Sequence, residues 1–137
     1  MSYAKNKTAD LWRSFMPRLK EIGPRDSNDL YSLQVYPPGF DFSPHTEFVK
    51  WALAPVAGLG VPPEGMELFT IPGGLYAVFH YRGRAGDPAI YQYIFSKWLP
   101  RSCYSLDNRP HFEILGEKFD PFSIHSEEEI WIPVSPA

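Results

Sequence analysis

The stretch HFEIL, residues 111–115, is a short apolar run with one carboxylate at its centre. Pro110 and Gly116 bracket it, so it is too short for a helix and typical of a strand. On a pleated strand Glu113 shares a face with His111, whereas the neighbours on either side of Glu113 point the other way. An ionised carboxylate among apolar side chains is costly unless it has a partner. The run therefore predicts a strand that offers one acid to a partner.

Aromatic residues surround this acid in the composition: four Trp, eight Tyr and ten Phe, or 16% of the chain. Aromatic rings supply flat apolar walls with polar tips, as ligand pockets require. Together with Glu113 they suggest a cavity for a cationic, flat, apolar guest. The alternative, which the residues leave open, is that Glu113 faces water or pairs with a Lys or Arg of a neighbouring strand.

Length and charge restrict the class of protein. With 137 residues the chain, 1–137, is expected to form a single domain. The net charge is −3 and there is no block of Lys or Arg, which argues against direct nucleic-acid binding. No apolar run has membrane-spanning length and the N-terminus does not resemble a signal peptide, so we expect no membrane partner and a cytoplasmic location.

Motifs for metals, cofactors and nucleophilic catalysis are absent from the sequence. The four histidines lack metal-ligand spacing, Cys103 is the only cysteine, and Gly73-Gly74 lacks a phosphate-loop context. We therefore expect no metal and no cofactor. The acidic run Glu127-Glu128-Glu129 is interpreted as the solvated start of the final strand.

The order of predicted elements indicates an α+β fold with an internal repeat. A helix from Thr8, kinked at Pro17, is followed by strands at 30–36 and 47–53. A hairpin of 66–71 with 75–81, a helix opened by Asp87-Pro88, and strands at 111–115 and 129–134 complete the chain. Two units result, about 8–56 and 66–134. The first lacks the strand that opens the second.

Four motifs recur in an order that resembles the GyrI-like small-molecule-binding domain, which is also the effector-binding domain of AraC-type and multidrug-sensing transcription regulators. They are PGGLYAVF (72–79), FSKWLP (95–100), RPHFEIL (109–115) and EEIWIPV (128–134). The resemblance extends from Thr8 to Pro133. It implies two pseudo-symmetric β-α-β-β units, a curved antiparallel sheet with two helices, and a ligand cleft between the units.

The same resemblance implies a role for Glu113, because multidrug-sensing relatives place a pocket glutamate in the corresponding strand opposite cationic aromatic ligands. Rings on strands can line a cleft between two units, so Tyr36, Trp51, Tyr76 and Trp131 are candidate ligand contacts, in addition to Glu113. His111 shares the strand face of Glu113 and completes the set.

Two departures from the family bear on partners. The chain has no helix-turn-helix region, so we do not expect it to be a complete regulator of that type. The first strand is missing, which leaves a sheet edge that invites pairing. A homodimer that covers this edge is therefore predicted.

Three functions follow as hypotheses. The leading one is a stand-alone module that senses or sequesters cationic, amphipathic aromatic molecules. The second is a hydrolase of strained electrophiles, in which Glu113 acts as general base and Tyr76 or Tyr36 orients the substrate. The third is a protein-interaction inhibitor, like the gyrase-inhibiting relatives of the family.

Overall fold

The computed structural model describes residues 1–58 and 60–137 and contains one antiparallel sheet. The strand order is β2-β1-β5-β6-β3, and the short strand β4 pairs with the far end of β6. The strands are β1 (Leu30–Val35), β2 (Val49–Leu53), β3 (Tyr76–Arg82), β4 (Tyr104–Leu106), β5 (His111–Leu115) and β6 (Glu127–Pro136). The two units therefore meet along β1 and β5, at the centre of the sheet.

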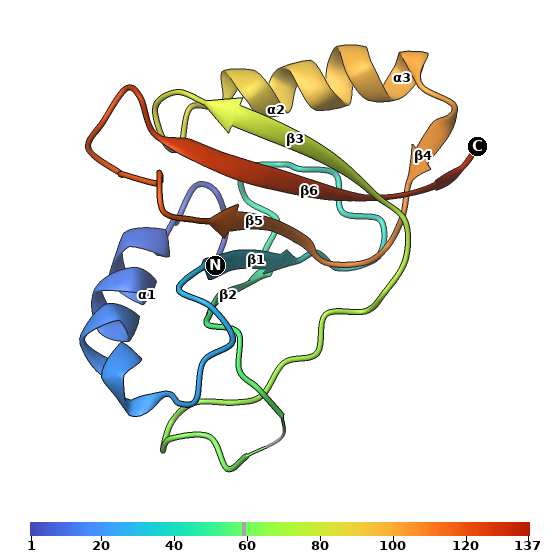
Figure 1. Cartoon of the computed structure of the whole chain (residues 1–137). Helices are drawn as coiled ribbons and strands as arrows, with labels where there is room; N and C mark the ends of the chain where they lie inside the picture. Colours follow the sequence, from blue (N-terminus) through green and yellow to red (C-terminus); the bar gives the residue numbers. More distant parts are fainter. Residues whose placement is uncertain (59) are drawn as a thin grey trace.

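Two helical segments accompany the sheet (Figure 1). The first is α1 (Thr8–Phe15), continued by the tighter 3₁₀ turn η1 (Met16–Glu21), and it contacts β2. The second combines α2 (Ala89–Tyr93), the π-helical η2 (Ile94–Trp98) and α3 (Leu99–Arg101). The predicted α+β fold is confirmed, and no strand precedes α1 in the described residues. The change at Met16 agrees with the break expected at Pro17, because proline cannot donate the helical hydrogen bond.

One buried hydrophobic cluster of the core lies between the second helical segment and the sheet. Ile94 is fully buried and packs against alternate residues of β6, namely Ile130, Ile132 and Val134. Because side chains alternate along a strand, these residues define the α2 side of the sheet, and Trp131 points to the opposite side. We call the side opposite α2 the open face, which also carries Phe112.

The predicted hairpin of 66–71 with 75–81 is wrong, because 66–71 is not a strand and β3 pairs with β6 instead. The reason lies in the topology. β2 and β3 occupy opposite edges of the sheet, so the chain between them has to cross the sheet and is not free to fold back beside β3. Phe69 of this crossing segment packs against Trp51, with ring centroids 4.9 Å apart.

The N-terminal residues lie beside the start of β2. The Met1 ammonium donates to the Phe48 carbonyl, and the Phe48 N–H donates back to the Met1 carbonyl. The Ala4 N–H donates to the Pro44 carbonyl, so the segment runs antiparallel to residues 44–48. The N-terminal segment thus lies beside residues 44–48, which precede β2, and not beside β2 itself.

Candidate functional site at the junction of the two units

Glu113 lies at the centre of the sheet, in β5, directly opposite Ser32 of β1. Its side chain is half-buried on the α2 side. Oε1 accepts a hydrogen bond of 2.6 Å from the Tyr91 hydroxyl of α2, and Oε2 accepts one of 3.2 Å from the Gln34 amide. Both carboxylate oxygens are thus bonded to neutral donors. Glu113 therefore differs from both alternatives that the sequence leaves open, a carboxylate that faces water and one that pairs with a Lys or Arg of a neighbouring strand.

Two further ionisable groups share this side of the sheet. Lys50 lies opposite Gln34 in the register, and burial lowers the pKa of its ammonium although Glu113 and Glu128 attract the charge. The pKa of Glu128 is raised to about 7, mainly by burial and in addition by the nearby Glu113 charge, whereas Lys50 opposes the shift. The region therefore holds two carboxylates and one cation away from water, where charge is costly and charge–charge interactions are strong.

An aromatic cluster borders Glu113 where β1 ends and β5 begins. The Tyr36 ring stacks on Phe40 with centroids 4.4 Å apart, and it meets His111 edge-on at 4.8 Å. Phe42 packs against Tyr36 and, across the junction, against Phe95 of the second helical segment at 5.0 Å. Burial raises the pKa of Tyr36 and lowers the pKa of His111 to about 4, so both side chains are neutral at physiological pH.

Phe42 has an unusual backbone conformation, with φ at 60°. Bulky residues seldom adopt the left-handed region, which costs about 1–3 kcal/mol unless the surroundings hold it. The contacts of its ring with both units provide that hold. The Phe42 ring thus fills the junction at the expense of a strained backbone.

A hollow of about 340 Å³ adjoins this cluster. One wall is the segment from Tyr36 to Phe42 of the first unit, and the other is the segment from Leu106 to His111 of the second. Apolar rings, the Arg109 side chain and the neutral His111 ring all line it. The position agrees with a cleft between the two units.

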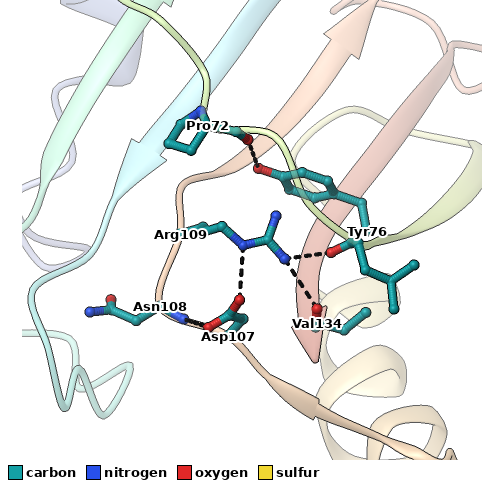
Figure 2. A network of polar contacts seen from close by, with 7 residues as sticks. Pro72, Tyr76, Asp107, Asn108, Arg109 and Val134 are labelled. Atoms are coloured by element: carbon teal, nitrogen blue, oxygen red, sulfur yellow. Dashed lines mark hydrogen bonds and ion pairs between the residues drawn. The ribbon is translucent and has the colours of Figure 1, made fainter. Parts of the chain in front are cut away.

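Arg109 fixes the second wall of the hollow. Its Nε donates to Asp107 at 2.9 Å, and its Nη2 donates to the carbonyls of Leu75 at 2.6 Å and Val134 at 3.1 Å. The guanidinium also lies 4.6 Å from the centre of the Tyr76 ring. Figure 2 shows how the Arg109 guanidinium links the loop before β5, the segment before β3 and the end of β6. These contacts give Arg109 a structural role.

The predicted site residues divide between the two sides of the sheet. Glu113, His111 and Tyr36 lie together at the junction, on the α2 side. Trp131 and Tyr76 lie on the open face, where Trp131 stacks on Phe112 at 5.3 Å and Tyr76 meets Trp131 edge-on at 5.6 Å. Trp51 also lies there, in contact with Phe69 of the crossing segment.

Sequence reasoning did not select Gln34, Lys50, Tyr91 and Phe42, although all four contribute to the junction. Gln34 and Lys50 are polar residues inside apolar strands, which is the same signal that singled out Glu113. Tyr91 belongs to an apolar helix stripe and gives no separate signal. Phe42 lies in an irregular segment, where no periodic pattern exists. In the described residues no cluster of His, Cys, Asp and Glu could hold a metal ion, and no helix there is long and apolar enough to cross a membrane.

The acidic run of β6 differs from the expected solvated strand start, since all three carboxylates are half-buried. β6 begins at Glu127 and is paired with β3 from its first residue. Glu127 accepts from His80 at 2.7 Å, Glu128 faces the junction, and Glu129 accepts from the Trp131 indole at 3.0 Å on the open face. Strand alternation thus separates Glu128 from Glu127 and Glu129, and the last two differ in their hydrogen-bond partners.

The raised pKa of Glu128 predicts a pH-dependent stability. Between pH 4.5 and about 7 the folded protein keeps a proton on Glu128 that the unfolded chain has released, so the free energy of unfolding falls as pH rises through this window. Glu128→Gln should remove this decline and stabilise the protein above the window by about 1–2 kcal/mol. Urea unfolding on either side of the window measures it.

Glu127→Gln is the matched control, because the hydrogen bond from His80 lowers the pKa of the neighbouring Glu127. This control should lose stability at high pH, with the opposite sign. Parallel pH profiles for Glu128→Gln and the wild type would contradict the assignment of Glu128 to a partly buried site beside the Glu113 carboxylate.

Comparison with known proteins places this geometry in context. A model described as the GyrI-like small molecule binding domain matches residues 1–135. The chain is also similar to the transcriptional regulator BrlR of Pseudomonas aeruginosa, with 31% identity over 127 residues. The match covers 90% of this chain and 45% of the regulator. The chain thus spans less than half the length of this relative.

Proposed function

The chain belongs to the GyrI-like small-molecule-binding family, and on that premise we propose that it binds flat, apolar cations at the junction of its two units. Glu113 is the counter-charge in this proposal, and the rings of Tyr36 and Tyr91 are the apolar contacts. A positively charged aromatic ligand combines the two features that the junction offers, a carboxylate and aromatic walls.

The observation that carries the proposal is the bonding of Glu113. Its carboxylate lies at the centre of the sheet and is bonded to the neutral Tyr91 and Gln34 side chains. A ligand cation that replaced one of these donors would form a stronger, charge-assisted contact. The attraction would exceed its value in water because the surroundings are apolar. Aromatic faces would add cation–π attraction of about 0.5–2 kcal/mol.

Access to Glu113 is supported by the hollow between the units. Phe42 and His111 line the hollow and also belong to the aromatic cluster that borders Glu113. Since the Phe42 backbone is strained, displacement of its ring by a ligand would release strain as well as vacate apolar space. We propose that a ligand enters from the hollow and replaces the Phe42 ring. Recognition by charge and flatness alone would make binding tolerant of ligand shape.

The biological role that fits is sensing or sequestration of such compounds. The relative in Pseudomonas aeruginosa is a transcriptional regulator, and this chain matches 45% of it. We propose that this chain recognises small molecules in a regulatory setting.

A hydrolase is the second candidate, favoured by the 2.6 Å contact between Glu113 and the Tyr91 hydroxyl. Glu113 would take a proton from an attacking water, and the Tyr91 hydroxyl would donate to the leaving atom. Burial raises the pKa of Tyr91 well above its ordinary value, so the hydroxyl keeps its proton. Of the two partners that the sequence suggested, Tyr36 lies at the junction but Tyr76 lies on the open face. Tyr91 therefore replaces it in this hypothesis.

Isothermal titration calorimetry with a lipophilic aromatic cation and its neutral isostere tests the proposal. We expect micromolar binding of the cation and binding at least about tenfold weaker for the neutral compound. Mass spectrometry of the recovered ligand separates binding from turnover, and a strained electrophile is included as a third compound. Equal affinity for cation and isostere would exclude Glu113 as the anchor, and product formation would favour the hydrolase.

A further inference from the structure

β3 forms an edge of the sheet with an unpaired outer side. Two backbone hydrogen bonds, one just before β3 and one just after it, show which residues face β6. The Val134 N–H donates to the Leu75 carbonyl, and the Gly83 N–H donates to the Ser126 carbonyl. Both Leu75 and Gly83 are odd-numbered, and the backbone groups of a strand alternate in direction. The N–H and C=O groups of Tyr76, Val78 and His80, together with those of Arg82, therefore point outward. In the described part of the chain these groups have no backbone partner.

This edge carries few of the features that protect edge strands. The pairing of β3 with β6 is regular over all seven residues, and the strand contains no proline and no lysine. Val78 is 47% exposed beside the outward backbone groups. A regular edge of this length, with an exposed valine at its centre, is a template for another strand.

The edge at β2 is different. Phe48 exchanges two backbone bonds with Met1, so the N-terminal segment occupies the position where an incoming strand would continue. By the same alternation, only Lys50 and Ala52 of β2 present outward groups. β3 therefore offers four outward residues to a strand of a second copy. The β2 edge, where the missing first strand predicts the dimer contact, offers only two.

We propose that β3 pairs with β3 of a second copy of this chain, antiparallel and about a twofold axis at Phe79. This pairing would join the two sheets into one and satisfy all the outward backbone groups of the strand. The proposal concerns assembly and is independent of the proposed ligand.

Side-chain complementarity supports a second copy as the occupant. In this register Tyr76 faces Arg82 of the other copy, and Val78 faces His80, so that no charge lies opposite a like charge. His80 is also hydrogen-bonded to Glu127 of its own chain at 2.7 Å. Phe79 faces its own copy on the α2 side, where such aromatic pairs contribute favourably.

Other registers fit less well. A shift by two residues in one direction places His80 opposite His80 and Tyr76 opposite Arg84, which lies beyond the end of β3. The same shift in the other direction places Arg82 opposite Gly74, where no side chain is available to pair. The register centred on Phe79 is therefore the one that pairs the whole strand.

The α2 side of this edge also suits a homodimer. Trp98 of the second helical segment lies over Phe79, with ring centroids 5.0 Å apart and planes at 88°. A twofold axis at Phe79 brings this ring pair close to its copy. The interface would then consist of a sheet joint covered on one side by aromatic rings, a combination typical of interface centres.

Light scattering with matched proline variants tests the proposal. We expect wild-type protein at micromolar concentration to have a mass near twice the 15.7 kDa of one chain. Val78→Pro removes an outward N–H without breaking a bond inside the chain, so it should give monomers. Ala52→Pro makes the same change at the outer edge of β2 and should leave the dimer intact.

Hydrogen exchange of the wild type provides a second measurement that needs no variant. The amides of Val78, His80 and Arg82 should exchange at least about tenfold more slowly at high than at low protein concentration, whereas those of Lys50 and Ala52 should not change. Wild-type monomers at every concentration would overturn the proposal. So would a dimer that survives Val78→Pro, or concentration-dependent protection at β2 in place of β3.

Discussion

Glu113→Gln is expected to weaken binding of a lipophilic aromatic cation by about 10–100-fold, which corresponds to about 1.4–2.7 kcal/mol. The substitution keeps the size and shape of the side chain and removes only its negative charge. The Tyr91 hydroxyl still finds an oxygen acceptor at this position, so the local packing should persist. Binding of a neutral isostere should change by less than about twofold, because it makes no use of the charge.

The open face provides the matched control for this experiment. Glu129 is also a half-buried carboxylate in the centre of the sheet, and it accepts a hydrogen bond from Trp131. Glu129→Gln removes the same charge from the opposite side, where it should leave cation affinity nearly unchanged. A loss confined to Glu129→Gln would move the site to the open face. Equal losses for cation and isostere in Glu113→Gln would show damage to the fold instead.

Arg109→Leu is expected to lower the free energy of unfolding by about 3 kcal/mol. The change leaves the carbonyls of Leu75 and Val134 without their charged donor and removes the cation–π contact with Tyr76. Arg109→Lys should recover little of this loss, since an ammonium cannot reproduce the planar fork that bonds in several directions. Urea unfolding followed by tryptophan fluorescence measures both variants.

The two neighbouring glycines provide a sharp comparison for the same group. A Cβ at Gly74 would lie 2.3 Å from Arg109 Nη1, and Gly74 has φ at 149°, whereas a Cβ at Gly73 meets nothing within 4 Å. Because Arg109 is held by its hydrogen bonds, Gly74→Ala has to displace it and should destabilise the protein. Gly73→Ala should be nearly neutral. If Arg109→Leu cost less than about 0.5 kcal/mol, or if the two alanine variants behaved alike, the structural role of Arg109 would be wrong.

Much of the fold could be predicted from periodic patterns. The run at 111–115 forms a strand as expected, and its alternation correctly places Glu113 with His111 and opposite to Phe112. The helix break at Pro17 follows from proline chemistry alone. These features depend on neighbours in the sequence, which a local pattern contains.

The pairing of strands was less predictable. Residues 66–71 alternate well enough for a hairpin with β3, yet β3 pairs with β6, about fifty residues away in the sequence. The choice depends on which edge of the sheet each strand occupies, and no local pattern contains that information. The same reason explains why candidate rings such as Trp131 and Tyr76 lie on the open face, away from Glu113.

The candidate site could be predicted in its centre but not in its surroundings. A carboxylate in an apolar strand is visible in the sequence, whereas the hydroxyl of Tyr91 reaches it from a helix stripe that reads as ordinary core. Phe42 enters the junction from an irregular segment through a left-handed backbone that bulky residues seldom adopt. Such contacts arise from tertiary packing and become visible only in the three-dimensional arrangement.

The structure of a complex with a lipophilic aromatic cation, solved by crystallography or from intermolecular NMR contacts, tests the central claim most directly. The account predicts a cation in contact with the Glu113 carboxylate on the α2 side, with aromatic contacts from Tyr36 and Tyr91 and the Phe42 ring moved aside. A cation bound on the open face, beside Glu129 and Trp131 and away from Glu113, would contradict it.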